Sequence, residues 1–85
     1  MVTAVEVIEE MKRIAQRELE LAGAIVGDAH LVRDLGLDSL GMTVLAVGLE
    51  DRFRVRLNEG DAEGIVTVDD LARLVVRRLA EQGPR

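Results

Sequence analysis

Apolar residues return every three or four positions near the start of the chain, as they do on one face of an α-helix. Thr3 is a suitable N-cap, and Glu6 three residues later completes the pattern of a capping box. We therefore predict a helix over about residues 4–20. Its apolar stripe is expected to lie in the core and consists of Val7, Ile8, Met11, Ile14, Ala15 and Leu21.

A second predicted helix, from about Ser39 to Arg54, is apolar on two faces. One stripe at helical spacing consists of Met42, Leu45, Ala46, Leu49 and Phe53. The other consists of Leu40, Val44 and Val47. One stripe can face the core. The other is either a docking surface for partner proteins or a face that packs under the long loops, and the pattern leaves both open.

A third long helix is predicted over about residues 68–81. Thr67 is its expected N-cap, and Asp69 and Asp70 lie in the first turn, where the helix dipole favours acids. The connection 22–38 is punctuated by glycines and loses helical phase. The connection 55–66 contains one short helical turn, from Gly60 to Gly64. These elements predict an all-α fold: a four-helix bundle of three main helices and a short third helix, in a single domain over residues 1–85.

Composition and charge limit the classes of function. The chain has no cysteine, which excludes disulfides and thiolate metal sites. The net charge is −5, and the stretch from Gly27 to Asp70 holds ten acids against four arginines. Nucleic acid is therefore not an expected partner, whereas basic surfaces of other proteins are. No apolar run approaches the roughly 20 residues of a membrane span, and no secretory signal is visible. We expect a cytoplasmic protein with no membrane partner.

The candidate chemistry lies at Asp38 and Ser39. Asp38 is a good N-cap for the second helix, and Ser39 follows in its first turn. A phosphate ester on the Ser39 hydroxyl would face the free N–H groups and the positive end of the helix dipole. Ser39 has no evident base, because His30 is the single histidine and is expected to make a polar contact in its loop. We therefore expect no catalytic residue, no metal site and no enzyme, and a Ser39 that another enzyme modifies.

The same residues carry a resemblance to a known family. The run Leu35-Gly-Leu-Asp-Ser-Leu40, followed by a helix that closes on Leu49-Glu-Asp-Arg-Phe53, resembles the acyl carrier proteins of fatty-acid and polyketide synthesis. The resemblance covers nearly the whole chain. It implies that Ser39 carries a 4′-phosphopantetheine arm derived from coenzyme A, and that Asp38 helps the transferase to recognise the site. The thiol of the arm would hold acyl or aminoacyl intermediates as thioesters.

The resemblance also implies a set of partners. They are a phosphopantetheinyl transferase, an acyl- or aminoacyl-loading ligase or acyltransferase, and a ketosynthase or other downstream enzyme, each meeting a monomeric carrier. Carriers of fatty-acid synthesis usually place acids on the early exposed face of the second helix, where this chain has Gly41 and Val44. We therefore expect partners to dock by apolar contact, over a surface that consists of Leu40, Val44, Val47, Glu50 and Asp51.

Three questions stay open at this point. The cargo and the pathway (fatty acid, polyketide, nonribosomal peptide or other) are not readable from the residues. The small residues Ala46, Gly48 and Ala72 could leave room for cargo among the helices, but a sequence does not show a cavity. The alternative function is an unmodified helical interaction module, or a structural subunit of a larger assembly.

Overall fold

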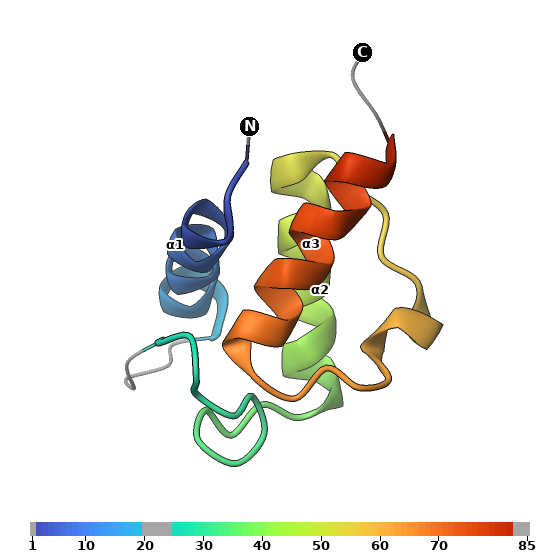
Figure 1. Ribbon diagram of the computed structural model, residues 1–85. Coiled ribbons are helices and arrows are strands. Elements are labelled where there is room, and N and C mark those ends of the chain that lie inside the picture. Colours follow the sequence, from blue (N-terminus) through green and yellow to red (C-terminus); the bar gives the residue numbers. More distant parts are fainter. Residues whose placement is uncertain (1, 20–24, 83–85) are drawn as a thin grey trace.

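A computed structural model of the chain describes residues 2–19 and 25–82, and within them the fold is built of helices joined by loops (Figure 1). The three long helices are α1 (Ala4–Ile14), α2 (Ser39–Phe53) and α3 (Val68–Gln82). Two short helical segments accompany them, η1 (Ala15–Leu19) and η2 (Glu59–Ala62). The predicted all-α architecture is confirmed. The predicted contribution of Leu21 to the first helix lies outside the described residues.

The first helix begins as predicted and ends differently. The Thr3 hydroxyl accepts the N–H of Glu6 at 3.3 Å, and the Glu6 carboxylate accepts the N–H of Thr3 at 3.4 Å, so the capping box is present. After Ile14 the coil widens into the π-helix η1 instead of continuing as an α-helix. The predicted short helix also shifts: η2 is a 3₁₀ turn that begins one residue before the predicted Gly60 and ends before Gly64.

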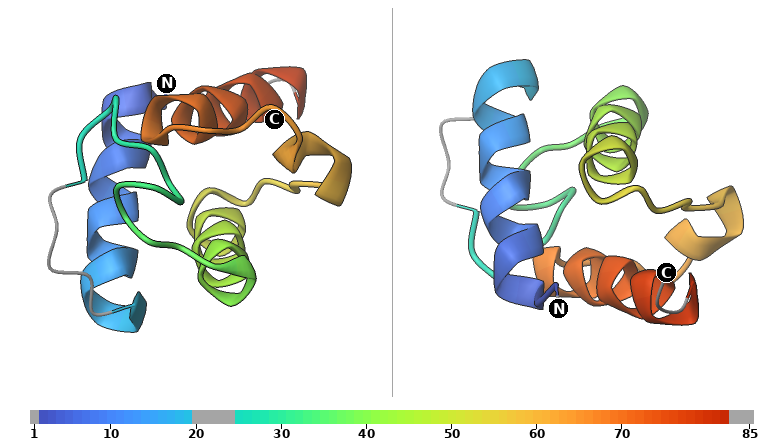
Figure 2. Two further views of the ribbon diagram at one scale, coloured as in Figure 1. Left: turned by 90° about the horizontal axis from the view of Figure 1, so that it is seen from below. Right: turned by 90° about the horizontal axis from the view of Figure 1, so that it is seen from above.

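The core lies where α1 packs against both α2 and α3 (Figure 2). Its members come from all three helices and from the loops between them. The largest fully buried side chains are those of Val7, Met11, Ile14, Leu31, Leu49, Val68 and Val75. The stripe of α2 that includes Leu45 and Leu49 faces this core, as the sequence predicted.

The long loop before α2 is tied to the start of α3 by an isolated antiparallel bridge between His30 and Thr67. The N–H of Leu31 donates to the carbonyl of Val66 at 2.9 Å, and the N–H of Val68 donates to the carbonyl of Ala29 at 3.0 Å. These bonds position the loop that leads into α2. As expected, His30 makes a local contact in the loop, because its Nδ1 accepts the N–H of Arg33 at 3.0 Å.

The two ends of the described chain lie far from the start of α2. In Figure 1 the first residues and the end of α3 are at the top, and α2 begins at the bottom. At the top, the side chain of Gln82 donates to the carbonyl of Arg54 at 3.4 Å, which joins the end of α3 to the end of α2. Ser39 therefore occupies the opposite end of the molecule.

Candidate functional site

Ser39 is the first residue of α2, and its side chain is exposed. Asp38 is the N-cap: its backbone is extended, and Oδ1 accepts the N–H of Gly41 at 2.8 Å. Just before it, Gly36 has a φ of +70°, a conformation that favours glycine and turns the loop into the helix. The sequence prediction of the N-cap is confirmed. The result is a serine hydroxyl that another protein can reach, at the positive end of a 15-residue helix.

The single histidine of the chain is engaged in its own loop. Nδ1 of the only histidine already accepts the backbone N–H of Arg33. In the part of the chain that the structure describes, no cluster of three or more histidine or acidic side chains is arranged to hold a metal ion. The same part of the chain contains no helix that is both long and apolar enough to span a membrane.

The second apolar stripe of α2 is largely open to solvent. The exposed fraction is 72% for Leu40 and 54% for Val47, so neither packs under the long loops. Val44 is half-buried and packs against the core. Among the two acids expected to join this surface, Asp51 is exposed and Glu50 is half-buried.

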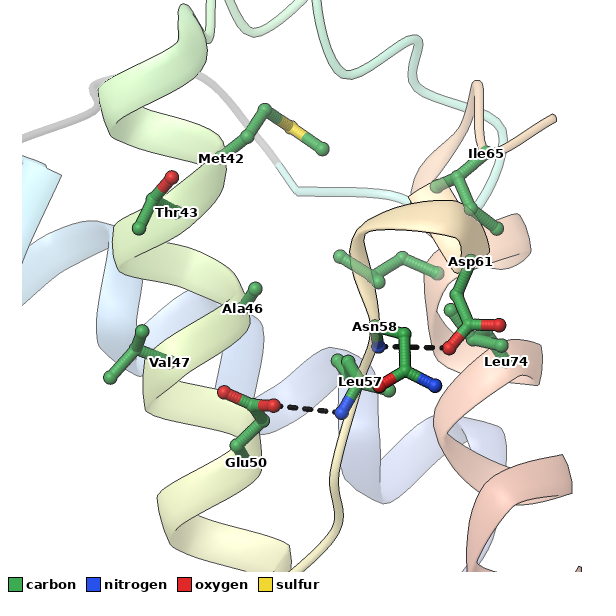
Figure 3. A pocket seen from close by; sticks show the side chains of 11 residues that line it. Met42, Thr43, Ala46, Val47, Glu50, Leu57, Asn58, Asp61, Ile65 and Leu74 are labelled. Carbon is green, nitrogen blue, oxygen red and sulfur yellow. Dashed lines mark hydrogen bonds between the residues drawn. The ribbon is translucent and has the colours of Figure 1, made fainter. Parts of the chain in front are cut away.

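A cavity of about 290 Å³ lies between α2, the connection that follows it and α3 (Figure 3). Its apolar lining includes Met42 and Ala46 from α2, Leu57 from the connection and Leu74 from α3. Of the three small residues that the sequence offered as room for cargo, only Ala46 lines this space. Ala72 is fully buried elsewhere in the core. The space beside Gly48 is filled by Ile14, whose Cδ1 lies 2.7 Å from the position of an added Cβ.

The outer wall of the cavity is formed by residues 55–62, which we call the strap. Oε2 of Glu50 accepts the backbone N–H of Leu57 at 2.7 Å, and this bond holds the strap to α2 (Figure 3). An ion pair between Asp61 and Arg78 holds it to α3. The sequence prediction missed both contacts, because their partners lie seven and 17 positions apart and no short motif joins them.

The electrostatics of the strap agree with this geometry. Asp61 accepts the backbone N–H of Asn58 at 2.9 Å, and this bond, with the Arg78 guanidinium beside it, holds the pKa of the Asp61 carboxyl below its usual value. The pKa of Arg78 is raised by hydrogen bonds to Asp61 and then to Glu81. Both groups are therefore charged near neutral pH, and the ion pair is intact there.

The sequence and the fold are similar to those of known proteins. The family model described as "Phosphopantetheine attachment site" matches residues 9–75. The acyl carrier protein of Campylobacter hominis is 30% identical over 71 residues, which cover 82% of this chain and 90% of that protein. The acyl carrier protein of Campylobacter fetus is 29% identical over 70 residues, covering 81% and 91%.

A solved structure is also similar to this chain over most of its length. It is a candidate acyl carrier protein from Mycobacterium tuberculosis, and it superposes with a TM-score of 0.70 at 30% identity, covering 89% of this chain and 97% of that one. The matched family domain is one to which 4′-phosphopantetheine is covalently attached. An exposed serine behind an aspartate N-cap suits such an attachment. The chain therefore belongs to the acyl carrier protein family, whose cofactor is 4′-phosphopantetheine.

Proposed function

We propose that Ser39 is the attachment point of the 4′-phosphopantetheine arm and that the chain carries acyl or aminoacyl groups on it as thioesters. The observation that carries this proposal is the exposed Ser39 hydroxyl at the N-terminus of α2, directly after the Asp38 N-cap. When bound, the arm supplies the thiol that holds the cargo. The phosphodiester on Ser39 would lie where the dipole of α2 favours negative charge. In this proposal Asp38 is the residue that the transferase recognises beside Ser39.

The work of the chain is delivery, and it catalyses no step itself. A cargo on a tether meets a docked enzyme at an effective concentration that free diffusion does not reach. The proposed setting is the cytoplasm, in fatty-acid, polyketide or related biosynthesis. The proposed partners are a phosphopantetheinyl transferase, a loading ligase or acyltransferase, and a ketosynthase or another downstream enzyme.

The first experiment is the intact mass after incubation with coenzyme A and a broad-specificity phosphopantetheinyl transferase, with Ser39→Ala as the control. We expect the wild type to gain one phosphopantetheinyl group and the variant to gain none. A folded wild type that gains nothing would overturn the proposal and favour the unmodified interaction module. A gain on Ser39→Ala would show that the arm is attached elsewhere.

We propose the exposed stripe of α2 as the docking surface, with Leu40 and Val47 at its centre and Asp51 at its edge. Leu40 and Val47 lie on the helix that carries Ser39, and their exposed apolar area is available to a partner. Val44 completes the stripe, but its packing against the core makes it a poor position for a test. Val47→Glu tests the surface without disturbing the core, and because Val47 also lines the cavity, the test uses the apo-protein, which carries no cargo.

We expect Val47→Glu to raise the KM of the apo-protein for the transferase by about 5- to 30-fold, which corresponds to about 1–2 kcal/mol. The matched control is Val5→Glu, since Val5 is an exposed valine on α1, with an exposed fraction of 68% against 54% for Val47. The control should leave KM unchanged. Equal effects of the two variants would show that added charge, rather than the lost apolar contact on α2, changes the KM.

The cavity beside this stripe is the proposed place for the cargo. It lies on α2, between Met42 near the site and Glu50 near the end of the helix. Its apolar lining suits an acyl chain, and its volume is at the small end of ligand pockets, which hold about 300–1,000 Å³. A short acyl group fits such a space as it stands, whereas a longer one requires a wall to move.

A further inference from the structure

We propose that Glu50 is a positioning residue that fastens the strap as the movable wall of the cavity, so that the cavity opens where the Glu50–Leu57 bond breaks. The assignment of the cavity to cargo rests on the proposed function, whereas the fastening does not. Glu50 was expected to contribute to docking. Its half-buried carboxylate also accepts a backbone N–H seven residues further along the chain.

The end of α2 is organised around Glu50. Its carbonyl accepts the N–H groups of Arg54 and Val55, and its carboxylate accepts that of Leu57. Arg54 is the C-cap of α2 and adopts the left-handed conformation, with a φ of 57°. The chain turns back toward the cavity at this residue. A hydrogen bond from an amide to an ionised carboxylate is stronger than one between neutral groups. The side chain of Glu50 therefore fixes where Leu57 lies against the cavity.

The rest of the strap is weakly held. Among the strap side chains whose burial is described, only that of Val55 is buried; those of Leu57 and Asp61 are half-buried, and those of Arg56 and Asn58 are exposed. The walls formed by α2 and α3 are 15-residue helices whose backbone hydrogen bonds are internal. Segments with few buried apolar contacts open locally at the least cost in free energy. The strap is therefore the wall that moves first, and the two fastenings at Glu50 and Asp61 control that motion.

Opening at Glu50 also enlarges the available space. A second, shallower depression that is largely open to solvent also borders Glu50 and Leu57, and its lining includes the charged residues Asp51 and Arg56. The cavity and the depression share four lining residues, which are Val47, Glu50, Leu57 and Asn58. In this proposal, breaking the Glu50–Leu57 bond frees Leu57, which lines both spaces, so that the cavity opens toward the depression. An acyl chain that outgrows the closed cavity then extends past Leu57 toward solvent.

Two substitutions of Glu50 distinguish the effect of its hydrogen bond to Leu57 from the effect of its negative charge. Glu50→Gln keeps an oxygen that can accept the Leu57 N–H but removes the charge, whereas Glu50→Ala removes both. Asp51→Ala is the matched control, because Asp51 is the neighbouring, exposed acid on the same helix. All variants are made in the apo-protein, and circular dichroism confirms that α2 and the other helices are retained.

The first readout is amide hydrogen exchange at Leu57. We expect Glu50→Ala to accelerate it at least tenfold, Glu50→Gln to stay within about threefold of the wild type, and Asp51→Ala to match the wild type. The second readout is the binding of a neutral apolar fluorophore, N-phenyl-1-naphthylamine, which should become stronger in Glu50→Ala alone. An unchanged Leu57 exchange in Glu50→Ala, or equal acceleration in Glu50→Gln, would overturn the proposal.

The wild type provides a test that needs no substitution. If the strap opens by itself, the Leu57 amide exchanges faster than the amide of Leu49 in α2, and its exchange depends little on denaturant. Exchange of Leu57 only through global unfolding would overturn the proposal. None of these readouts needs the arm, and each is expected to be the same in Ser39→Ala. A failure of the strap proposal is therefore distinguishable from a failure of arm attachment.

Discussion

Gly48 shows how a single residue sets the spacing of two helices. A Cβ at this position would lie 2.7 Å from Cδ1 and 3.1 Å from Cγ1 of Ile14, which is only 1% exposed and has little room to move. Glycine in a helix interior costs about 1 kcal/mol relative to alanine. The close approach of Ile14 to α2 explains why the chain accepts that cost here.

We expect Gly48→Ala to destabilise the protein by up to about 2 kcal/mol, because overpacking costs about 1–3 kcal/mol and the gain in helix propensity offsets only about 1. Ile14→Val removes the clashing Cδ1 and alone costs about 0.5–1.5 kcal/mol. The free energy of unfolding lost in the double variant should be smaller than the sum of the losses in the two single variants, by at least about 1 kcal/mol. Urea unfolding measures the cycle, and additivity within about 0.3 kcal/mol would contradict the packing argument.

The start of α3 shows what one element needs in order to begin at a defined residue. Oδ2 of Asp70 accepts the N–H groups of Val66 and Thr67, at 2.9 and 3.0 Å, and the Thr67 hydroxyl accepts the N–H of Asp70 at 3.2 Å. These bonds, first that from Thr67 and then that from Val66, hold the pKa of Asp70 below its ordinary value of 3.8. Arg73 adds an ion pair to the same carboxylate.

A lowered pKa in the folded state means that ionised Asp70 stabilises the fold at pH values above 3.8, and that this contribution is lost as the pH falls through the lowered value. We expect Asp70→Asn to make the melting temperature less dependent on pH below about 4, since asparagine does not titrate. Melting curves at pH 7, 4 and 2.5 measure the effect, with Asp51→Asn as the control. The same loss of stability on acidification in the wild type and Asp70→Asn would contradict it.

At the scale of the whole molecule, one buried carboxylate joins α1, η1 and α2. Glu10 is 5% exposed, and its oxygens lie 2.9 Å from Arg13, 3.9 Å from Arg17 and 3.6 Å from Arg52. The three guanidinium groups are themselves more than half exposed. Removal of Glu10 would therefore leave them in water rather than buried without a partner.

We expect Glu10→Leu to leave the free energy of unfolding within about 1 kcal/mol of the wild type or to raise it, since an apolar side chain of similar size avoids the desolvation of a buried carboxylate. Glu10→Ala should cost more than Glu10→Leu, because it removes packing as well as charge. Arg52→Ala should cost less than about 1 kcal/mol. Guanidinium chloride screens the ion pairs, so urea is the denaturant to use. A large loss in Glu10→Leu would show that the ion pairs are net stabilising.

The parts of this fold that follow from short sequence patterns were predictable. The N-caps at Thr3, Asp38 and Thr67 need only a side chain and an N–H three residues away, and the apolar stripes need only helical spacing. The strap was not predictable. Its fastening at Glu50 depends on a reversal at Arg54, whose left-handed conformation is uncommon for a residue other than glycine.

The same limit applies to the candidate site. Asp38 and Ser39 were located by motif and capping chemistry, and the exposure of Leu40 agrees with the open alternative of a docking face. The cavity was not predictable, because it depends on which of the small residues of α2 is packed against a side chain from another helix. Ile14 fills the space at Gly48, 34 positions away in the sequence, and leaves Ala46 open.

Ser39 and the two ends of the described chain lie at opposite ends of the molecule, and this has a practical consequence. A surface or resin linked beyond Val2 or Gln82 would hold the molecule by the end at the top of Figure 1 and leave the start of α2 facing the solution. Immobilised in this way, the protein would present its serine in a uniform outward orientation. If Ser39 carries the arm as proposed, candidate enzymes can be passed over a loaded layer and ranked by the label that each removes.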